Sequence, residues 1–226
     1  MLPAEISVAG ERLILHPHRA LYWDRLRWLV VSDLHLGKAA HFRKAGAALP
    51  EGQDEGTLAR LDALIANFRP ERLLILGDLF HSSHNTSWAP FTAWALRQSI
   101  PLHLVPGNHD ILADRRYADA GLHVCDDTLE EGPFVFAHEP AERPGVYGMG
   151  GHIHPGVVLS GQARQRLRLP CFWFGERLAI IPAFGLSTGL HVIRPERTDR
   201  VYACTERAVL DVNGALAGRA TSPRTK

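Results

Sequence analysis

The sequence predicts an α/β fold, and three observations support this class. In the first half of the chain, apolar runs typical of buried strands alternate with segments of helical periodicity. The resulting order of strand, helix, strand, helix, strand, helix is typical of a sheet built through crossover connections. From Leu122 onward, short strands follow one another and are separated by tight turns.

In the first half, strands are expected where apolar residues cluster. The segments on either side of Ala9-Gly10-Glu11 predict a hairpin, and the continuous apolar runs at 27–32 and 73–76 predict strands that are buried on both faces. The predicted strands of this half cover residues 6–8, 12–16, 20–23, 27–32, 73–76 and 101–105.

Three helices are expected between these strands. Residues 52–67 have apolar side chains at helical spacing, acidic residues at the start and Pro70 beyond the end. Ser87 is expected to cap a second helix, whose aromatic stripe is typical of core packing. A short third helix is expected over 111–118.

The second half is expected to form a further set of strands. A hairpin that turns at Gly175-Glu176 is expected to join two of them. The predicted strands cover residues 133–137, 157–160, 167–174, 178–181, 202–204 and 208–212.

The length of 226 residues fits a single domain over 1–226, and the Gly-, Ser-, Thr- and Arg-rich stretch 213–226 is expected to be a flexible tail. No apolar run approaches the ~20 residues of a membrane span, and the first ten residues lack the pattern of a signal peptide. We therefore expect a cytoplasmic protein with no membrane contact.

Cysteine usage and net charge argue against two further classes of protein. Cys125, Cys171 and Cys204 are widely spaced and form no Cys-x-x-Cys pair, which argues against a disulfide framework and fits a reducing compartment. The net charge of +1 is too small for a protein that coats duplex nucleic acid, so any such contact would be local. The 13 histidines are the unusual part of the composition.

Polar clusters follow several of the apolar strands. In an extended segment, residues two apart point the same way, so Asp33 and His35 are expected to leave the end of strand 27–32 side by side. Because ligand groups gather where the strands of an α/β sheet end, we expect all the clusters to meet. They are Asp33-x-His35, Gly77-Asp78, Gly107-Asn108-His109-Asp110, His138 and Gly151-His152-x-His154.

The side chains of these clusters predict a metal site. Carboxylate, amide and imidazole groups are the ligands that suit Mn²⁺, Fe²⁺ or Zn²⁺ in a hydrolytic centre. A glycine before Asp78, Asn108 and His152 allows a sharp turn or a close approach of the backbone. One histidine at a strand end is usually an ordinary surface or core residue, but five such clusters in this order are hard to obtain by chance.

The ordered clusters resemble the signature of the calcineurin-like metallophosphoesterases, which runs D-x-H, G-D, G-N-H-[DE], H and G-H-x-H. This resemblance implies a four-layer α/β/β/α sandwich of two mixed sheets and a pair of metal ions roughly 3.5–4 Å apart. Asp78 would then bridge the two ions. By the same resemblance, the first ion would be held by Asp33, His35 and His154, and the second by Asn108, His138 and His152.

A finer resemblance is to the ligase-associated DNA damage response endonucleases. It rests on the basic continuation Phe42-Arg43 after the first cluster, on Leu169–Trp173 and on Pro182–Gly185. The resemblance implies a bacterial, manganese-dependent DNA nuclease that acts in repair beside an ATP-dependent ligase and a helicase.

The charges of such a centre favour a phosphodiester as substrate. Two divalent ions, the carboxylates Asp33 and Asp78 and a bridging hydroxide would leave about one net positive charge, and a hydroxide held between the ions is the expected nucleophile. The resemblance implies that His109 protonates the leaving oxygen or stabilises the transition state. Asp110 would either orient the imidazole of His109 or cap the helix that follows it.

Basic side chains near the first cluster could bind the backbone of a polymer. Lys38 and Arg43 follow His35 closely, whereas Arg166 and its basic neighbours two residues to either side could form a second basic strand face or a solvated edge. A phosphatase or small-nucleotide phosphodiesterase with the same chemistry is the alternative function, and a non-catalytic scaffold is a remote one. The sequence leaves a homo-oligomer open.

Overall fold

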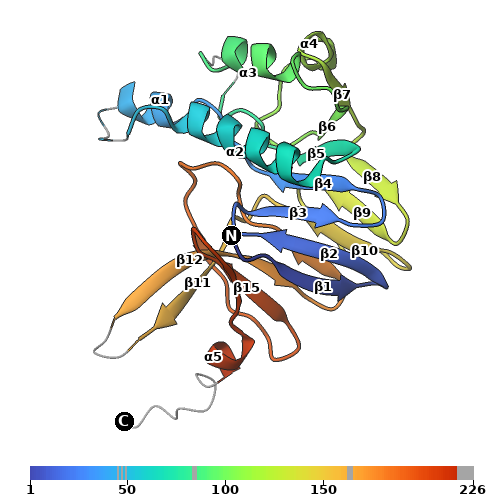
Figure 1. The fold of residues 1–226 in the computed structure, drawn as a ribbon, viewed down its shortest axis with the longest axis vertical. Helices are drawn as coiled ribbons and strands as arrows, with labels where there is room; N and C mark the ends of the chain where they lie inside the picture. The colour runs from blue at the N-terminus through green and yellow to red at the C-terminus, as the bar shows by residue number, and fades with distance from the viewer. Residues whose placement is uncertain (45, 47, 49, 83–85, 162–164, 218–226) are drawn as a thin grey trace.

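Two mixed β-sheets pack face to face in the computed structural model, with helices outside them (Figure 1). The structure describes all residues except 45, 47, 49, 83–85, 162–164 and 218–226. The α/β class and the expected sandwich of two mixed sheets are therefore confirmed.

The first sheet has the strand order β1-β2-β3-β4-β5-β6-β7. Its first four strands pair antiparallel and its last four, from β4 onward, pair parallel. Parallel neighbours require crossover connections, which α2 (Gln53–Phe68), α3 (Trp88–Ala95) and α4 (Asp114–Asp119) supply. The strands are β1 (Ala4–Val8), β2 (Glu11–His16), β3 (Ala20–Trp23), β4 (Trp28–Ser32), β5 (Arg72–Leu76), β6 (Leu102–Val105) and β7 (Leu122–Val124).

The second sheet has the order β14-β11-β12-β13-β10-β9-β8, and β15 pairs with both β12 and β16. The hairpin predicted at Gly175-Glu176 is present, because β12 and β13 pair antiparallel. The strands are β8 (Thr128–Glu131), β9 (Phe134–Ala137), β10 (Tyr147–Gly150), β11 (Pro155–Ser160), β12 (Arg166–Phe174), β13 (Leu178–Ile180), β14 (His191–Val192), β15 (Arg200–Cys204) and β16 (Val209–Asp211).

The helices agree with the predicted positions in two cases and differ in two. Helix α2 (Gln53–Phe68) and helix α3 (Trp88–Ala95) lie where helical periodicity placed them. Helix α4 (Asp114–Asp119) begins later than expected, and α1 (Lys38–Lys44) forms where we expected only a basic segment. Ser87 occupies the N-cap position of α3 as expected, but its side chain makes no capping bond, and its hydroxyl donates to the carboxylate of Asp54.

Three apolar clusters separate the layers of the sandwich. Alternate residues of β4 point to opposite faces, so Val30 packs between the two sheets and Val31 packs under the helices. The cluster under the helices includes Leu61 of α2 and Phe91 of α3. A third cluster lies on the outer face of the second sheet, where Leu216 of α5 (Asn213–Ala217) packs on it.

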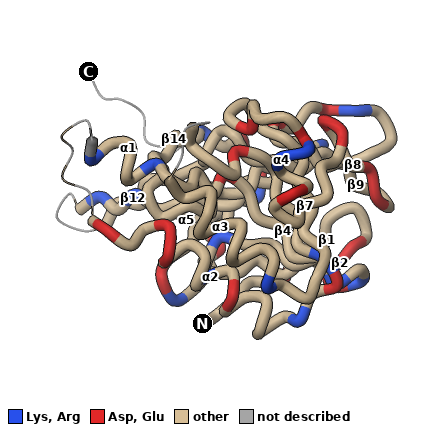
Figure 2. Tube along the Cα trace, turned by 90° about the horizontal axis from the view of Figure 1, so that it is seen from above, with Lys and Arg blue, Asp and Glu red and all other residues tan. Residues whose placement is uncertain are grey.

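Part of the expected flexible tail is helical. Residues Asn213–Ala217 form α5, and the remainder of 213–226 lies outside the described residues. No helix in the described part of the chain is long and apolar enough to cross a membrane. Acidic and basic residues are interspersed along the chain (Figure 2).

Candidate metal centre

The polar clusters predicted from the sequence all follow the ends of central strands. Strand β4 leads into Asp33 and His35, and the parallel neighbours β5 and β6 lead into Asp78 and His109. In the second sheet, the parallel strands β9 and β10 lead into His138 and His152. Because the two sheets face each other, the ends of both sets converge on one place.

The backbone at this place is strained. Asp33, His35, Asp78, His152 and His154 all have positive φ, between 47° and 65°, a region that non-glycine residues rarely adopt. Each such conformation costs on the order of 1–3 kcal/mol and is typical of functional sites. The expected extended geometry of Asp33-x-His35 is therefore wrong, and the two side chains meet because both residues turn into the left-handed region.

One group of ligand atoms surrounds Asp33 and His35. The Nε2 of His154 lies 3.2 Å from Asp33 Oδ1 and 3.2 Å from His35 Nε2. The Nε2 of His35 lies 3.6 Å from Asp78 Oδ2. The ligand atoms of Asp33, His35 and His154 all lie within 4.8 Å of one another, close enough to share a single cation.

A second group forms on the other side of Asp78. The Nε2 of His138 lies 3.5 Å from Asp78 Oδ1 and 3.1 Å from His152 Nδ1. Asn108 lines a cavity of about 360 Å³ together with His138. The two carboxylate oxygens of Asp78 thus face two different sets of imidazoles.

The donor set fits divalent metal ions. Imidazole nitrogens face each other at 3.1–3.2 Å in both groups, and Asp33 Oδ1 is buried without a well-aligned hydrogen bond. Burial lowers the pKa of His35 to about 3, so this imidazole is neutral, which is the form that binds metals. Burial is the largest single effect on the pKa of Asp33 and raises it, but the contacts with His154, Ser32 and His138 together lower the pKa below its usual value, so the carboxylate stays ionised.

Comparison with known proteins agrees with this geometry. The family model for calcineurin-like phosphoesterases matches residues 26–166, which is more than half of the chain and includes every predicted ligand. The chain belongs to the calcineurin-like phosphoesterase family.

A solved structure supports the same assignment over almost the whole phosphoesterase. The nuclease MPE of Pseudomonas putida is 35% identical, with a TM-score of 0.79, and the match covers 92% of this chain and 100% of that one. The phosphoesterase Yfce of E. coli matches with 12% identity and a TM-score of 0.42, over 81% of this chain and 96% of its own. No curated protein matches the chain significantly.

His109 lies at the open side of the phosphoesterase centre. Its side chain is exposed, its ring centroid is 5.4 Å from that of His35, and its backbone N–H donates to Asp78 Oδ1 at 2.9 Å. The backbone bond holds the loop against the bridging carboxylate, and a ring nitrogen of His109 lies within 4.8 Å of ligand atoms of both His35 and Asp78.

Asp110 binds the backbone of two loops of the centre. Its carboxylate accepts bonds from the backbone N–H groups of Gly107, at 2.9 Å, and Leu79, at 3.1 Å. Burial raises the pKa of Asp110 to about 6. The expected helix cap is wrong because α4 begins at Asp114. The carboxylate of Asp110 instead connects the loop that carries Asp78 with the loop that carries Asn108.

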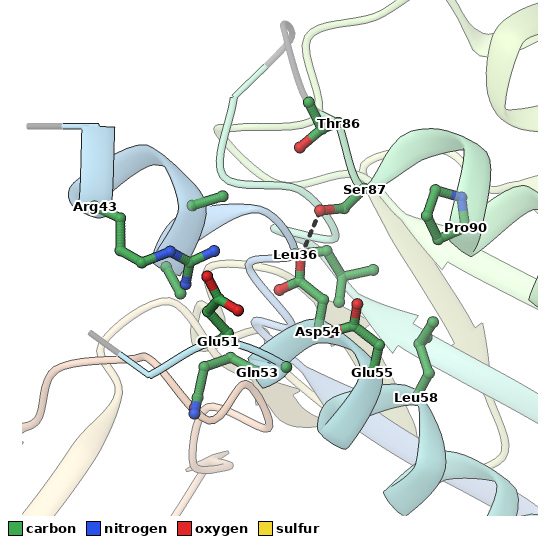
Figure 3. A pocket seen from close by; sticks show the side chains of 13 residues that line it. Leu36, Arg43, Glu51, Gln53, Asp54, Glu55, Leu58, Thr86, Ser87 and Pro90 are labelled. Carbon is green, nitrogen blue, oxygen red and sulfur yellow. Dashed lines mark hydrogen bonds between the residues drawn. The ribbon is translucent and has the colours of Figure 1, made fainter. Parts of the chain in front are cut away.

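The two expected substrate-binding cations lie in different surroundings. Lys38 is the first residue of α1 and lies close enough to Asp33 and Asp78 for both to raise its pKa, although burial has the larger, opposite effect. Arg43 projects into a separate cavity of about 300 Å³ (Figure 3). Its Nη1 donates to the carbonyl of Pro50 at 2.9 Å. None of the predicted ligands is among the described residues that line this cavity, so the structure favours Lys38 over Arg43 as a substrate contact.

Two residues of the centre were missed by the sequence analysis. The buried hydroxyl of Ser32 contacts the carboxylate of Asp33 and lies 3.0 Å from the carbonyl of Leu76. His81 stacks on His109 with ring centroids 5.5 Å apart. Ser32 could have been found from its place directly before Asp33, whereas no sequence pattern marks His81.

Proposed function

We propose that this phosphoesterase is a nuclease that hydrolyses the phosphodiester bonds of DNA. One observation carries the proposal: Asp78 presents one oxygen to each of two imidazole groups, which is the layout of a two-ion phosphoesterase centre. The similarity to the nuclease MPE over 92% of the chain supports nucleic acid as the substrate.

The proposed cofactor is a pair of Mn²⁺ ions, which suit mixed carboxylate and imidazole ligands. Asp33, His35 and His154 would hold one ion, and Asn108, His138 and His152 would hold the other, with Asp78 between them. Bound ions would supply charge that polarises the phosphodiester and lowers the pKa of a water molecule.

His109 and Lys38 are the proposed contacts to the substrate. The exposed imidazole of His109 can protonate the leaving oxygen or stabilise the charge of the transition state. Lys38 can bind a phosphate beside the reacting one, because it lies next to the carboxylates of the centre and carries a positive charge. Asp110 would position His109 indirectly, by fixing the loop from Gly107.

The cellular role that fits this activity is bacterial DNA repair in the cytoplasm, by a single domain over 1–226 that works beside a DNA ligase and a helicase. A pull-down with either protein, followed by a reconstituted repair assay, tests this association. Unchanged repair without the phosphoesterase would contradict it.

The first experiment compares substrates and metals with the purified wild-type protein. Hydrolysis of bis(p-nitrophenyl) phosphate, p-nitrophenyl phosphate, and single-stranded and duplex DNA is measured with Mn²⁺, Fe²⁺, Zn²⁺ or EDTA. We expect Mn²⁺-dependent cleavage of DNA and of the diester, and little cleavage of the monoester. A clear preference for the monoester, or for small diesters with no cleavage of DNA, would replace a nuclease by a phosphatase or a small-nucleotide phosphodiesterase.

The second experiment separates metal binding from proton transfer. Asp78→Ala should lose both ions and all hydrolysis, whereas His109→Asn should keep its metal content and lose about 10²–10⁴-fold in kcat on DNA. The loss for His109→Asn should be much smaller on bis(p-nitrophenyl) phosphate, whose leaving group needs no proton. Full metal occupancy in Asp78→Ala would contradict the bridging role. Equal losses on both substrates in His109→Asn would contradict proton transfer and assign His109 to stabilisation of the transition-state charge.

A further inference from the structure

A row of three rings runs from the metal centre toward solvent. The ring of His81 lies 5.5 Å from that of His109, with 27° between the planes, and 5.7 Å from that of Phe42, with 31° between the planes. We refer to His109, His81 and Phe42 as the aromatic row. Such distances and angles are those of rings that overlap with an offset.

The row begins beside a predicted ligand and ends at the surface. Its inner ring, His109, is 5.4 Å from the ring of His35. Its outer ring, Phe42, is 41% exposed, and it is the one phenylalanine among the exposed large hydrophobic residues in the described part of the chain. The row therefore connects the reacting centre with a flat apolar surface that solvent can reach.

Helix α1 directs the outer end of the row. Lys38, His41 and Phe42 are related by three and four residues, so they share one face of the helix. The ring of His41 lies 5.1 Å from that of His81, which places this face against the loop that follows β5. The same face thus presents a cation near the carboxylates of the centre and a ring farther out.

We propose that Phe42, supported from behind by His81, forms a stacking subsite for an unpaired nucleobase of the nucleotide next to the scissile phosphate. Lys38 would bind the adjacent phosphate while the base lies on the aromatic row. This inference rests on the proposed nuclease function and extends it from the phosphate to the base. A base inside a duplex has both faces covered by its neighbours, so the subsite selects nucleotides that are single-stranded or have left the stack.

The alternative explanation is a purely structural one, in which these rings only pack α1 onto the loop after β5. The two explanations differ in one measurable property, which is dependence on the base. A packing role affects cleavage whether or not the substrate has a base, whereas a stacking role affects only substrates that have one.

The experiment compares an oligonucleotide with a matched oligonucleotide that lacks bases on the nucleotides flanking the cleavage site. Aromatic model diesters are avoided because a nitrophenyl ring could itself stack. The quantity measured is the ratio of kcat/KM for the normal and the abasic oligonucleotide, in the wild-type protein and in Phe42→Ala, Phe42→Trp and His81→Ala. Leu96→Ala, which truncates a 64% exposed side chain just after α3, is the control.

We expect the wild-type protein to prefer the normal oligonucleotide, and Phe42→Ala to reduce the ratio about 5- to 100-fold, the range typical of one stacked base. Phe42→Trp should restore the ratio, and Leu96→Ala should not change it. In EDTA, a 2-aminopurine placed at the flanking nucleotide should lose fluorescence on binding the wild-type protein, and less so on binding Phe42→Ala.

A ratio near one in the wild-type protein, or an equal ratio in Phe42→Ala and the wild-type protein, would overturn the stacking subsite and leave the nuclease function intact. If the wild-type protein cleaves a small diester but neither oligonucleotide, the nuclease function fails and the subsite fails with it. The two failures are therefore distinguishable.

Discussion

The Nδ1 of His138 donates a hydrogen bond to the backbone carbonyl of Leu76, at a distance of 3.0 Å. A carbonyl can only accept, so the proton of this imidazole is on Nδ1 and its Nε2 is free to bind a metal. The bond joins the last residue of β5 to the residue after β9, and therefore fixes one sheet relative to the other at the centre.

The His138–Leu76 bond predicts the effect of replacing the histidine. His138→Ala removes both the ligand and its support, so we expect the loss of one ion per chain by elemental analysis and a fall in hydrolysis of at least about 100-fold. His123→Ala, which truncates an exposed histidine of β7, is the matched control and should keep both ions. Unchanged metal content in His138→Ala would show that Nε2 is not a ligand.

A glycine beside this bond should be intolerant of substitution. Gly77 has φ of +71°, and a Cβ there would lie 2.4 Å from His138 Nδ1 and 2.7 Å from the Cα of Gly107. We expect Gly77→Ala to lower the free energy of unfolding by about 3 kcal/mol or more, and to lose metal. Urea unfolding measures the first effect and elemental analysis the second.

Gly10 provides the matched control for Gly77. It has φ of +83°, yet a Cβ added there would meet no atom within 4 Å beyond its chain neighbours. Gly10→Ala should therefore show only the cost of the left-handed conformation, about 1–2 kcal/mol. Equal losses for the two variants would mean that backbone strain, and not the clash with His138, dominates at Gly77.

Arg19 should support the centre from behind. Its Nη1 donates to the carbonyls of Ala183, at 3.1 Å, and Gly185, at 3.2 Å, and the N–H of Gly185 donates to the carbonyl of Asp33. Arg19→Ala removes both bonds. The carbonyl of Ala183 loses this donor, whereas that of Gly185 keeps the bond from the hydroxyl of Thr188, so we expect a loss of about 1–3 kcal/mol in unfolding free energy and weaker metal binding. Arg12→Ala removes only exposed ion pairs and should cost far less, so a comparable loss there would argue against the support by Arg19.

Lys38 should act on long substrates through its charge. Lys38→Gln removes one phosphate contact, so the dependence of DNA binding on salt should become shallower by about one unit in a plot of log affinity against log salt. Arg177→Gln, at an exposed position in the hairpin between β12 and β13, is the control. The slope is measured by titration of a fluorescent oligonucleotide, and an unchanged slope in Lys38→Gln would count against the contact.

Stability should fall in mild acid because of His16. This side chain is 8% exposed, its Nδ1 accepts a bond from the backbone N–H of His18, and burial lowers its pKa to about 4. In the unfolded chain the imidazole of His16 takes up a proton near pH 6.5, well before it does so in the folded protein. The contribution of His16 to the free energy of unfolding is therefore complete above pH 6.5, and up to about 3 kcal/mol is lost as the pH falls toward 4.

His16→Asn tests this pH dependence, because an asparagine oxygen can accept the same bond without titrating. Urea unfolding at pH 7 and pH 5 should show a smaller difference in the variant than in the wild-type protein. The same difference in both proteins would assign the acid sensitivity to other groups.

Local patterns in the sequence determined much of this molecule. Continuous apolar runs located β4 and β5, and helical periodicity located α2. A strand buried on both faces and a helix buried on one face each leave a pattern of apolar residues that can be recognised in the sequence alone. The ordered clusters also determined the family. Strand β10 escaped prediction because Tyr147–Gly150 is short and half glycine, and it is stabilised by its neighbours β9 and β13 and not by its own preference.

Only the tertiary structure decided how the centre is arranged. His35 and His154 are 119 residues apart in the chain and meet at 3.2 Å, and the two oxygens of Asp78 are divided between groups from both sheets. The direction of a side chain depends on backbone angles that distant contacts impose, so the positive φ of Asp33 and the place of Asp110 could not be predicted locally. For the same reason, the stacking of His81 between His109 and Phe42 became visible only when α1 lay against the loop after β5.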